Sequence, residues 1–106
     1  MTTRKRKATD AMGFLEEITG GPLTFAETLL AIRQGEGWSQ SEMGRKLGIS
    51  RAHVCDIEKG RRLPSADRAA RFARVLGYSE TQFVRLALQD QLCQSGLKMT
   101  VSVDAA

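Results

Sequence analysis

The side chains that could do chemistry in this chain gather in the stretch RAHVCDIEKGRR, residues 51–62. This stretch holds the single histidine of the chain and four cations, Arg51, Lys59, Arg61 and Arg62. Guanidinium and ammonium groups donate hydrogen bonds to phosphates and to the edges of bases. The four cations therefore indicate a surface that binds an anionic partner.

Catalytic chemistry has little support in the same sequence. His53 is the only histidine, no nucleophile has a suitable base, and the sequence has no phosphate-cradling loop and no metal-ligand cluster. Cys55 and Cys93 lie far apart in the sequence, and we expect free thiols in a reducing compartment. We therefore predict a protein that is not an enzyme and that takes no cofactor and no metal.

The net charge of +4 is distributed unevenly along the chain. Residues 45–74 carry nine Lys or Arg against three acidic residues, and residues 1–7 carry four cations and no acid. Positive charge gathered around one segment favours a polyanionic partner. No apolar run approaches the length of a membrane span, and the basic amino terminus lacks the apolar segment of a secretory signal. We expect a cytoplasmic protein that makes no membrane contact.

Helix start and stop signals indicate the elements that must position these side chains. The pairs with capping-box spacing are Thr24/Glu27, Ser39/Glu42 and Ser79/Gln82. Ser50 and Ser65 are further expected caps, each followed by apolar residues at helical spacing. The pattern predicts five short helices over about residues 24–93, the first four closed by glycines.

The second and third predicted helices meet at Gly48-Ile49-Ser50. Two helices joined by so short a turn form a helix-turn-helix, whose second helix enters the major groove of DNA. The apolar positions that such a unit buries are Met43, Leu47, Ile49, Val54 and Ile57. Projection at 100° per residue places the small or charged residues Ala52, Cys55 and Lys59 on the outward side, with Arg51 and Asp56 at its margins. We expect this outward side to face the groove.

Residues 39–62, SQSEMGRKLGISRAHVCDIEKGRR, resemble the phage repressor-like (Xre-type) helix-turn-helix family. They match its run of Ser-Gln, an apolar position, Leu-Gly-Ile-Ser, a branched apolar pair and Glu-x-Gly. The resemblance implies an all-α, five-helix repressor-like domain, which we expect to be followed by a short C-terminal β-strand. Gly44 departs from the family, which more often has Ala there, and this glycine should weaken the second helix slightly.

The resemblance also implies roles for single side chains at a double-stranded DNA operator. The residues that it places against bases are Arg51, Ala52 and Asp56, and we add His53, which lies near the margin of the core. The residues expected to contact phosphates are Gln40, Ser50, Lys59, Arg61 and Arg62, because the resemblance implies the first two and the others lie at the end of the third helix. A phosphate contact by the basic tail at Arg4–Lys7 is an alternative to a solvated terminus.

Several charged residues have a second interpretation. Asp56 could accept from cytosine or exclude wrong sites, but we favour an ion pair with Lys59, three residues further on. Glu58 is interpreted as a structural partner of nearby Arg or backbone groups. For the arginines of the fourth helix we favour a solvated coat, and these are Arg68, Arg71 and Arg74.

Apolar residues near the carboxyl end exceed what one core-facing stripe needs. Residues 97–103 alternate between apolar and polar types, which predicts a strand with no partner in an all-helical domain. The residues expected to contact a second copy or another protein are Val84, Leu88, Leu92, Met99, Val101 and Val103. A homodimer is the economical explanation, because repressors of this type read two half-sites.

The predicted organisation has four parts. Residues 1–9 form a disordered basic tail, residues 10–22 a short helix or linker, residues 23–94 the helix-turn-helix domain, and residues 95–106 a C-terminal strand and tail. Small Xre-type proteins with such an extension resemble antitoxins of bacterial toxin–antitoxin operons. We therefore predict a sequence-specific repressor of the bacterial cytoplasm, associated with the nucleoid when bound to DNA. It would be an autoregulating antitoxin with a cognate toxin, or alternatively a stand-alone phage or chromosomal repressor.

Overall fold

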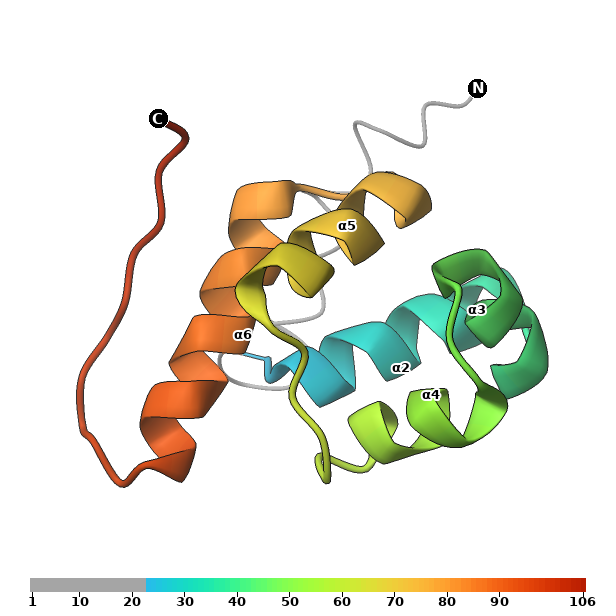
Figure 1. Cartoon of the computed structure of the whole chain (residues 1–106), viewed down its shortest axis with the longest axis horizontal. Coiled ribbons are helices and arrows are strands. Elements are labelled where there is room, and N and C mark those ends of the chain that lie inside the picture. The colour runs from blue at the N-terminus through green and yellow to red at the C-terminus, as the bar shows by residue number, and fades with distance from the viewer. Residues whose placement is uncertain (1–22) are drawn as a thin grey trace.

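The computed structural model describes residues 23–106, so the expected basic tail (1–9) and the expected helix or linker (10–22) lie outside the described residues. The described part is all-α, and the five predicted helices are confirmed (Figure 1). In chain order these helices are α2 (Phe25–Glu36), α3 (Gln40–Leu47), α4 (Arg51–Glu58), α5 (Ala66–Leu76) and α6 (Glu80–Gln94). Within residues 23–106 none of them combines the length and the apolar character that crossing a bilayer requires.

Each helix begins at a Ser or Thr whose side chain accepts a hydrogen bond from a backbone N–H of the first turn. Both reciprocal bonds of the capping box form at Thr24 with Glu27 and at Ser39 with Glu42. The backbone N–H of Ser39 donates to Glu42 Oε1 at 2.7 Å, and this bond lowers the pKa of Glu42. At Ser79 the hydroxyl accepts from the Gln82 N–H at 3.3 Å, and only this half of the predicted box is formed.

Apolar side chains from all five helices meet in one core. Phe25 of α2 and Phe83 of α6 pack edge to face with ring centroids 5.4 Å apart, and Phe72 of α5 is equally buried. The predicted interior positions of the helix-turn-helix are confirmed, since all are buried except Ile49, which packs half-buried against the core; they are Met43, Leu47, Ile49, Val54 and Ile57. Full burial of one such side chain stabilises a fold by roughly 1.5–3 kcal/mol.

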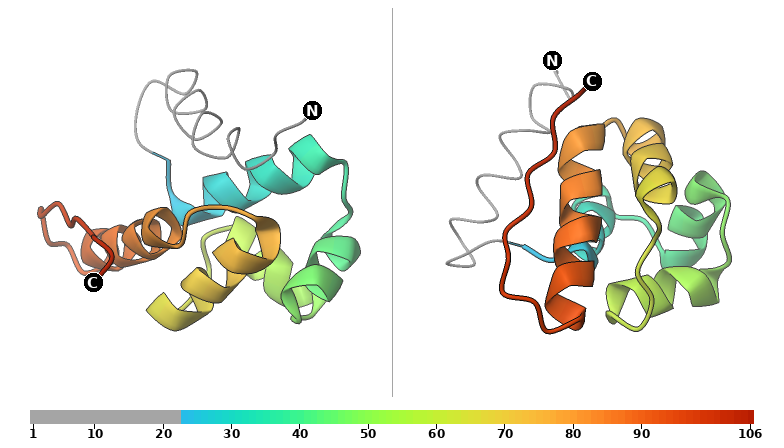
Figure 2. Two further views of the ribbon diagram at one scale, coloured as in Figure 1. Left: turned by 90° about the horizontal axis from the view of Figure 1, so that it is seen from above. Right: turned by 60° about the vertical axis from the view of Figure 1, so that its left-hand side comes forward.

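α2 connects two pairs of packed helices (Figures 1 and 2). α3 packs on α4, α5 packs on α6, and α2 contacts both α4 and α6. The start of α2 is tied to α6, because the backbone N–H of Phe25 donates to Asp90 Oδ2 at 2.9 Å. Burial raises the pKa of Asp90, which is also close to Glu27. This arrangement leaves one side of α4 facing away from the core.

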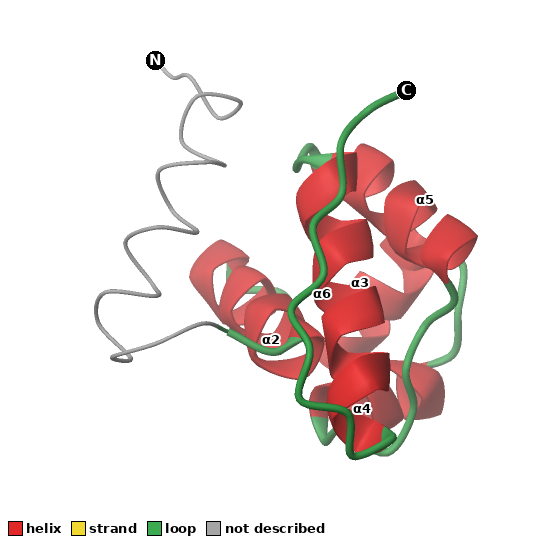
Figure 3. Cartoon of the chain, turned by 90° about the vertical axis from the view of Figure 1, so that its left-hand side faces the viewer, coloured by secondary structure: helices red, strands yellow, loops and turns green. Residues whose placement is uncertain are grey.

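The predicted C-terminal strand is wrong for the described chain. Residues 97–106 contain no strand and follow the side of α6 as an irregular extended segment (Figure 3). The side-chain amide of Gln89 supplies the hydrogen bonds that a neighbouring strand would have given: its Nε2 donates to Met99 O at 2.7 Å, and its Oε1 accepts from the Val101 N–H at 2.9 Å. The segment therefore finds its partner within the same molecule.

Candidate nucleic-acid interface

The turn between α3 and α4 fixes the angle at which α4 is presented. Gly48 closes α3 with φ 74°, a left-handed conformation that glycine adopts without steric cost. The N–H of Ile49 donates to Gly44 O at 2.9 Å, and a Cβ added at Gly44 would lie 2.6 Å from Ile49 O. Gly44 therefore does more than weaken its helix, because its missing side chain lets the turn approach α3 closely.

The outward side of α4 is small and basic, as predicted. Arg51, Ala52 and Lys59 are exposed, Cys55 is half-buried, and Val54 faces the core. The eight residues of α4 span about 12 Å at 1.5 Å per residue, which matches the width of about 12 Å of the major groove. The helix can therefore enter that groove with its small side chains foremost.

A buried ion pair holds α4 against α2. Arg33 donates to Glu58 from Nε at 2.6 Å and from Nη2 at 3.1 Å, and the two side chains are only 16% and 4% exposed. Arg33 Nη1 also donates to Trp38 O at 2.9 Å, in the connection to α3. The interpretation of Glu58 as a structural partner of an arginine is confirmed, although the partner lies 25 positions away in the sequence.

The same carboxylate positions two of the predicted DNA contacts. Gln40 Nε2 donates to Glu58 Oε1 at 3.0 Å, and Gln40 Oε1 accepts from Arg51 Nη1 at 3.3 Å. Arg33, Glu58, Gln40 and Arg51 thus form a continuous chain of hydrogen bonds from the interior to the outward side of α4. These bonds were not predicted, because spacing along the sequence does not reveal contacts between three different helices.

Ser50 and Asp56 are each engaged inside the protein. The Ser50 hydroxyl oxygen accepts from the His53 N–H at 3.0 Å, so the predicted cap is confirmed. The hydroxyl proton of Ser50 remains available to a phosphate. Asp56 pairs with Arg61, whose Nη1 lies 3.0 Å from Asp56 Oδ1, and not with Lys59. The expected intrahelical pair is therefore wrong, since α4 ends at Glu58 and the chain then returns Arg61 to Asp56.

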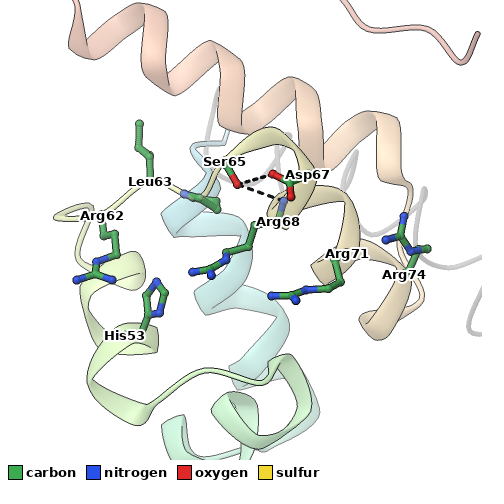
Figure 4. Close-up of a pocket in the computed structure, with 9 residues that line it drawn as sticks. His53, Arg62, Leu63, Ser65, Asp67, Arg68, Arg71 and Arg74 are labelled. Atoms are coloured by element: carbon green, nitrogen blue, oxygen red, sulfur yellow. Dashed lines mark hydrogen bonds between the residues drawn. The ribbon is translucent and has the colours of Figure 1, made fainter.

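His53 lies at the edge of α4 that faces α5 (Figure 4). Its Nε2 is shielded from solvent and has no hydrogen-bond partner among the described residues. Desolvation lowers the pKa of His53, and the charges of Arg62 and Arg68 lower it further, against a smaller opposite effect of Asp56. Both effects favour the neutral form of the imidazole, which stands in a positive electrostatic environment.

Comparison with known proteins agrees with this geometry. A helix-turn-helix family model matches residues 29–83, about half of the chain. The chain belongs to the helix-turn-helix family. It is therefore a DNA-binding protein of the class that regulates transcription, and the matched residues run from the middle of α2 to the first turn of α6.

This helix-turn-helix protein is similar to a solved structure. That structure is a crystal structure described as the hypothetical transcription factor NHTF from Neisseria. The two share 28% sequence identity with a TM-score of 0.51, and the match covers 57% of this chain and 69% of the other. No curated protein matches the chain.

The predicted contact residues of this helix-turn-helix protein lie in two groups, one at each end of α4. Gln40, Ser50 and Arg51 come together where α3 meets α4. Lys59, Arg61 and Arg62 follow the end of α4, where Arg61 is paired with Asp56. Within residues 23–106 no group of acidic, histidine or cysteine side chains could hold a metal ion.

Proposed function

We propose that this chain is a sequence-specific transcriptional repressor that places α4 in the major groove of an operator and blocks transcription by occupying it. The observation that carries the proposal is the hydrogen-bond chain from Arg33 through Glu58 and Gln40 to Arg51. An arginine that is oriented before binding loses less side-chain entropy when it binds a base, and Arg is the commonest partner of guanine. A transcription factor in the structural comparison supports the same assignment.

In this proposal each predicted contact has a stated role. The residues that face bases are Arg51, Ala52 and Asp56, with Arg51 donating to guanine O6 and N7. His53, which was also predicted to contact bases, is left out of this set because it lies at the edge of α4 that faces α5 (Figure 4) and its Nε2 is shielded from solvent. The residues that bind phosphates are Gln40, Ser50, Lys59, Arg61 and Arg62. Asp56 now acts chiefly through Arg61, because the ion pair at 3.0 Å uses its carboxylate.

The experiment is the selection of bound duplexes from a random library, followed by titration of the selected operator and of single-base variants. For Arg51→Ala we expect a loss of about 1–3 kcal/mol on the operator and relaxed preference at one base pair. Arg45→Ala removes the same charge from an exposed position of α3 and is the control. Any loss of affinity that it causes should be equal on every duplex. If Arg51→Ala lost affinity equally on every duplex, Arg51 would not read bases.

The proposed repressor acts as a homodimer that reads two half-sites about 34–36 Å apart. Val84, Leu88 and Leu92 of α6 are half-buried, and Met99 beside them is 60% exposed, so apolar surface remains for a second copy. Val101 and Val103 complete the set of proposed contacts.

The antitoxin hypothesis has less support than the repressor. It depended on the small size of the chain, on an unpaired strand at residues 97–103 and on the apolar side of α6, and the strand is not formed. The small size and the apolar residues of α6 are its remaining support. Co-purification with the product of the neighbouring gene would favour a cognate toxin, whereas a homodimer that represses its own promoter alone would favour the stand-alone repressor.

A further inference from the structure

Beside the recognition helix the protein has a basic groove between α4 and α5, with a volume of about 610 Å³. Four arginines and one histidine line it: Arg62, Arg68, Arg71, Arg74 and His53. Figure 4 shows Arg62 and His53 on one side, Arg68 at the centre, and Arg71 and Arg74 further along α5. We call this feature the α4–α5 groove.

Positive charge in the α4–α5 groove is largely uncompensated. Asp67 is the one carboxylate that lines it within residues 23–106, and Asp67 Oδ1 accepts from Ser65 Oγ at 2.8 Å, a bond that lowers the pKa of Asp67. Arg74 is paired with Glu80 at 3.0 Å, outside the groove lining. For Arg62, Arg68 and Arg71 the described residues provide no acidic partner within ion-pair distance. Arg71 lies over the ring of Phe72 at 5.9 Å, but its charge, like those of Arg62 and Arg68, has no acidic partner among the described residues and is open to an anionic ligand.

Three arginines of this groove are close together along α5. Arg68, Arg71 and Arg74 follow one another at intervals of three residues, so they form a row along one side of α5 with a rise of about 4.5 Å per step. A site for a free nucleotide would be mostly apolar and enclosed, with side chains on which a base can stack. Among residues 23–106 the only apolar residues that line the groove are Leu63 and Pro64, and none of its described lining residues is aromatic apart from the imidazole of His53. The lining thus favours phosphates without a stacked base.

The groove is also continuous with the surface that we assign to DNA. Arg62 belongs both to the proposed phosphate contacts and to the groove, and His53 belongs both to α4 and to the groove. Burial is the main cause of the lowered pKa of His53, and the charges of Arg62 and Arg68 in the same groove lower it further. A duplex that contacts Arg62 is therefore already at the mouth of the groove.

We propose that the α4–α5 groove binds backbone phosphates of the same duplex that α4 reads, with Arg68 and Arg71 as phosphate-binding residues. This inference rests on the proposed function and extends it, because the arginines of α5 become part of the DNA-binding surface. The interpretation of Arg68 and Arg71 as a solvated coat is replaced. Arg74 contributes less, because Glu80 already offsets its charge.

The test is the salt dependence of operator binding for the full chain and for Arg68→Gln with Arg71→Gln. Each phosphate contact adds about 0.9 to the magnitude of the slope of log K against log salt, so the double variant should lose about 1.8. The ratio of operator to non-operator affinity should stay the same, since phosphates carry no sequence information. Arg68→Lys with Arg71→Lys keeps both charges and should retain most of the slope.

Two matched variants make the result specific. Arg85→Gln removes one charge from α6, which does not line the groove, and Arg74→Gln removes the arginine that is already paired. Both should change the slope less than either Arg68→Gln or Arg71→Gln. Circular dichroism melting of every variant establishes that it is folded.

An unchanged slope in a folded double variant would overturn the inference while leaving the proposed repressor intact. The inference would also fail if tripolyphosphate stabilised the wild-type chain but not the double variant, with the slope for DNA unchanged, because the groove would then bind a small anion. If the wild-type chain bound no duplex at low salt, the proposed function itself would fail.

Discussion

Glu58 lies at the end of α4, almost fully buried, and accepts three hydrogen bonds from side chains of α2 and α3. A carboxylate suits this place because both of its oxygens accept and its charge balances that of Arg33. Removing one member of a buried pair is costly, since the other charge remains without compensation.

For Glu58→Gln we expect the free energy of unfolding to fall by about 3 kcal/mol, because the new amide leaves Arg33 unpaired. Urea denaturation measures this loss. Glu80→Gln is the matched control, because the Arg74–Glu80 pair is largely exposed and such pairs contribute at most about 1 kcal/mol. If the two substitutions lowered the free energy of unfolding equally, burial would not make the Arg33–Glu58 pair more important for stability than an exposed pair.

His53 gives the free protein a pH dependence. Its folded-state pKa lies below its ordinary value of 6.5, so the unfolded chain binds more protons at and just below pH 6.5. Stability should therefore be full above that pH and decline as the pH falls through the window below it. The His53→Gln variant should lack this part of the decline. Thermal melting of both proteins between pH 7.5 and about 5.5 provides the measurement.

A wild-type and variant pair with parallel stability profiles would contradict the lowered pKa. The charged groups that act on His53 are Arg62, Arg68 and Asp56. Arg62→Gln should raise the folded-state pKa of His53 toward its ordinary value, so the window narrows from its low-pH side and the stability lost within it becomes smaller. Carboxylates titrate mainly below pH 5 and affect both proteins alike.

At the scale of helices and turns, local signals predicted more than long-range contacts. Five caps, each a Ser or Thr before a helical run, were sufficient to place α2 to α6, since capping is decided within three or four residues. The pair of Arg33 with Glu58 could not be predicted, because it depends on how α2 and α4 cross. Asp56 was given the wrong partner for a related reason: the bend after Glu58 brings Arg61 closer to it than Lys59.

The strand at residues 97–103 shows a different difficulty. Alternation of apolar and polar residues describes an extended backbone, but it does not say what the backbone pairs with. Here the amide of Gln89 makes both hydrogen bonds, and one side chain on a helix cannot be recognised as a strand partner from spacing. The extended shape was predicted, whereas the sheet was not formed.

The close turn at Gly44 leads to a prediction for α3. Gly44→Ala should gain about 1 kcal/mol of helix propensity, but its Cβ would meet Ile49 O at 2.6 Å, where backbone must move. Overpacking of this kind typically costs about 1–3 kcal/mol, so we expect a net loss of stability and weaker DNA binding as α4 is displaced. Urea denaturation and operator titration measure the two effects.

Gly35→Ala is the control for Gly44→Ala. Gly35 lies within α2, and nothing is within 4 Å of a Cβ built there, so this substitution should raise the free energy of unfolding by about 0.5–1 kcal/mol. If Gly44→Ala were stabilising to the same degree, the turn would not need the close approach.

At the scale of the whole molecule, the proposed dimer depends on the apolar side of α6. For Leu88→Lys we expect the dissociation constant of the dimer to rise about tenfold or more, because a charge would have to be buried in the contact. Sedimentation over a range of concentrations measures this constant. Val75→Lys, at a half-exposed apolar position of α5, should leave it unchanged. A monomeric wild-type protein would contradict the proposed dimer. An unchanged dissociation constant for Leu88→Lys would show that the dimer contact does not include this side of α6.

The support that Arg51 receives has a consequence for engineering. A recognition helix transplanted from another repressor would bring its own residues at positions 51 and 58, but Gln40 and Arg33 belong to α3 and α2 and would stay behind. Arg33 and Gln40 Nε2 would then need a new acceptor at position 58, and Gln40 Oε1 would need a new donor at position 51. Retargeting this protein to a new DNA sequence therefore requires redesign of residues 33, 40, 51 and 58 as one unit.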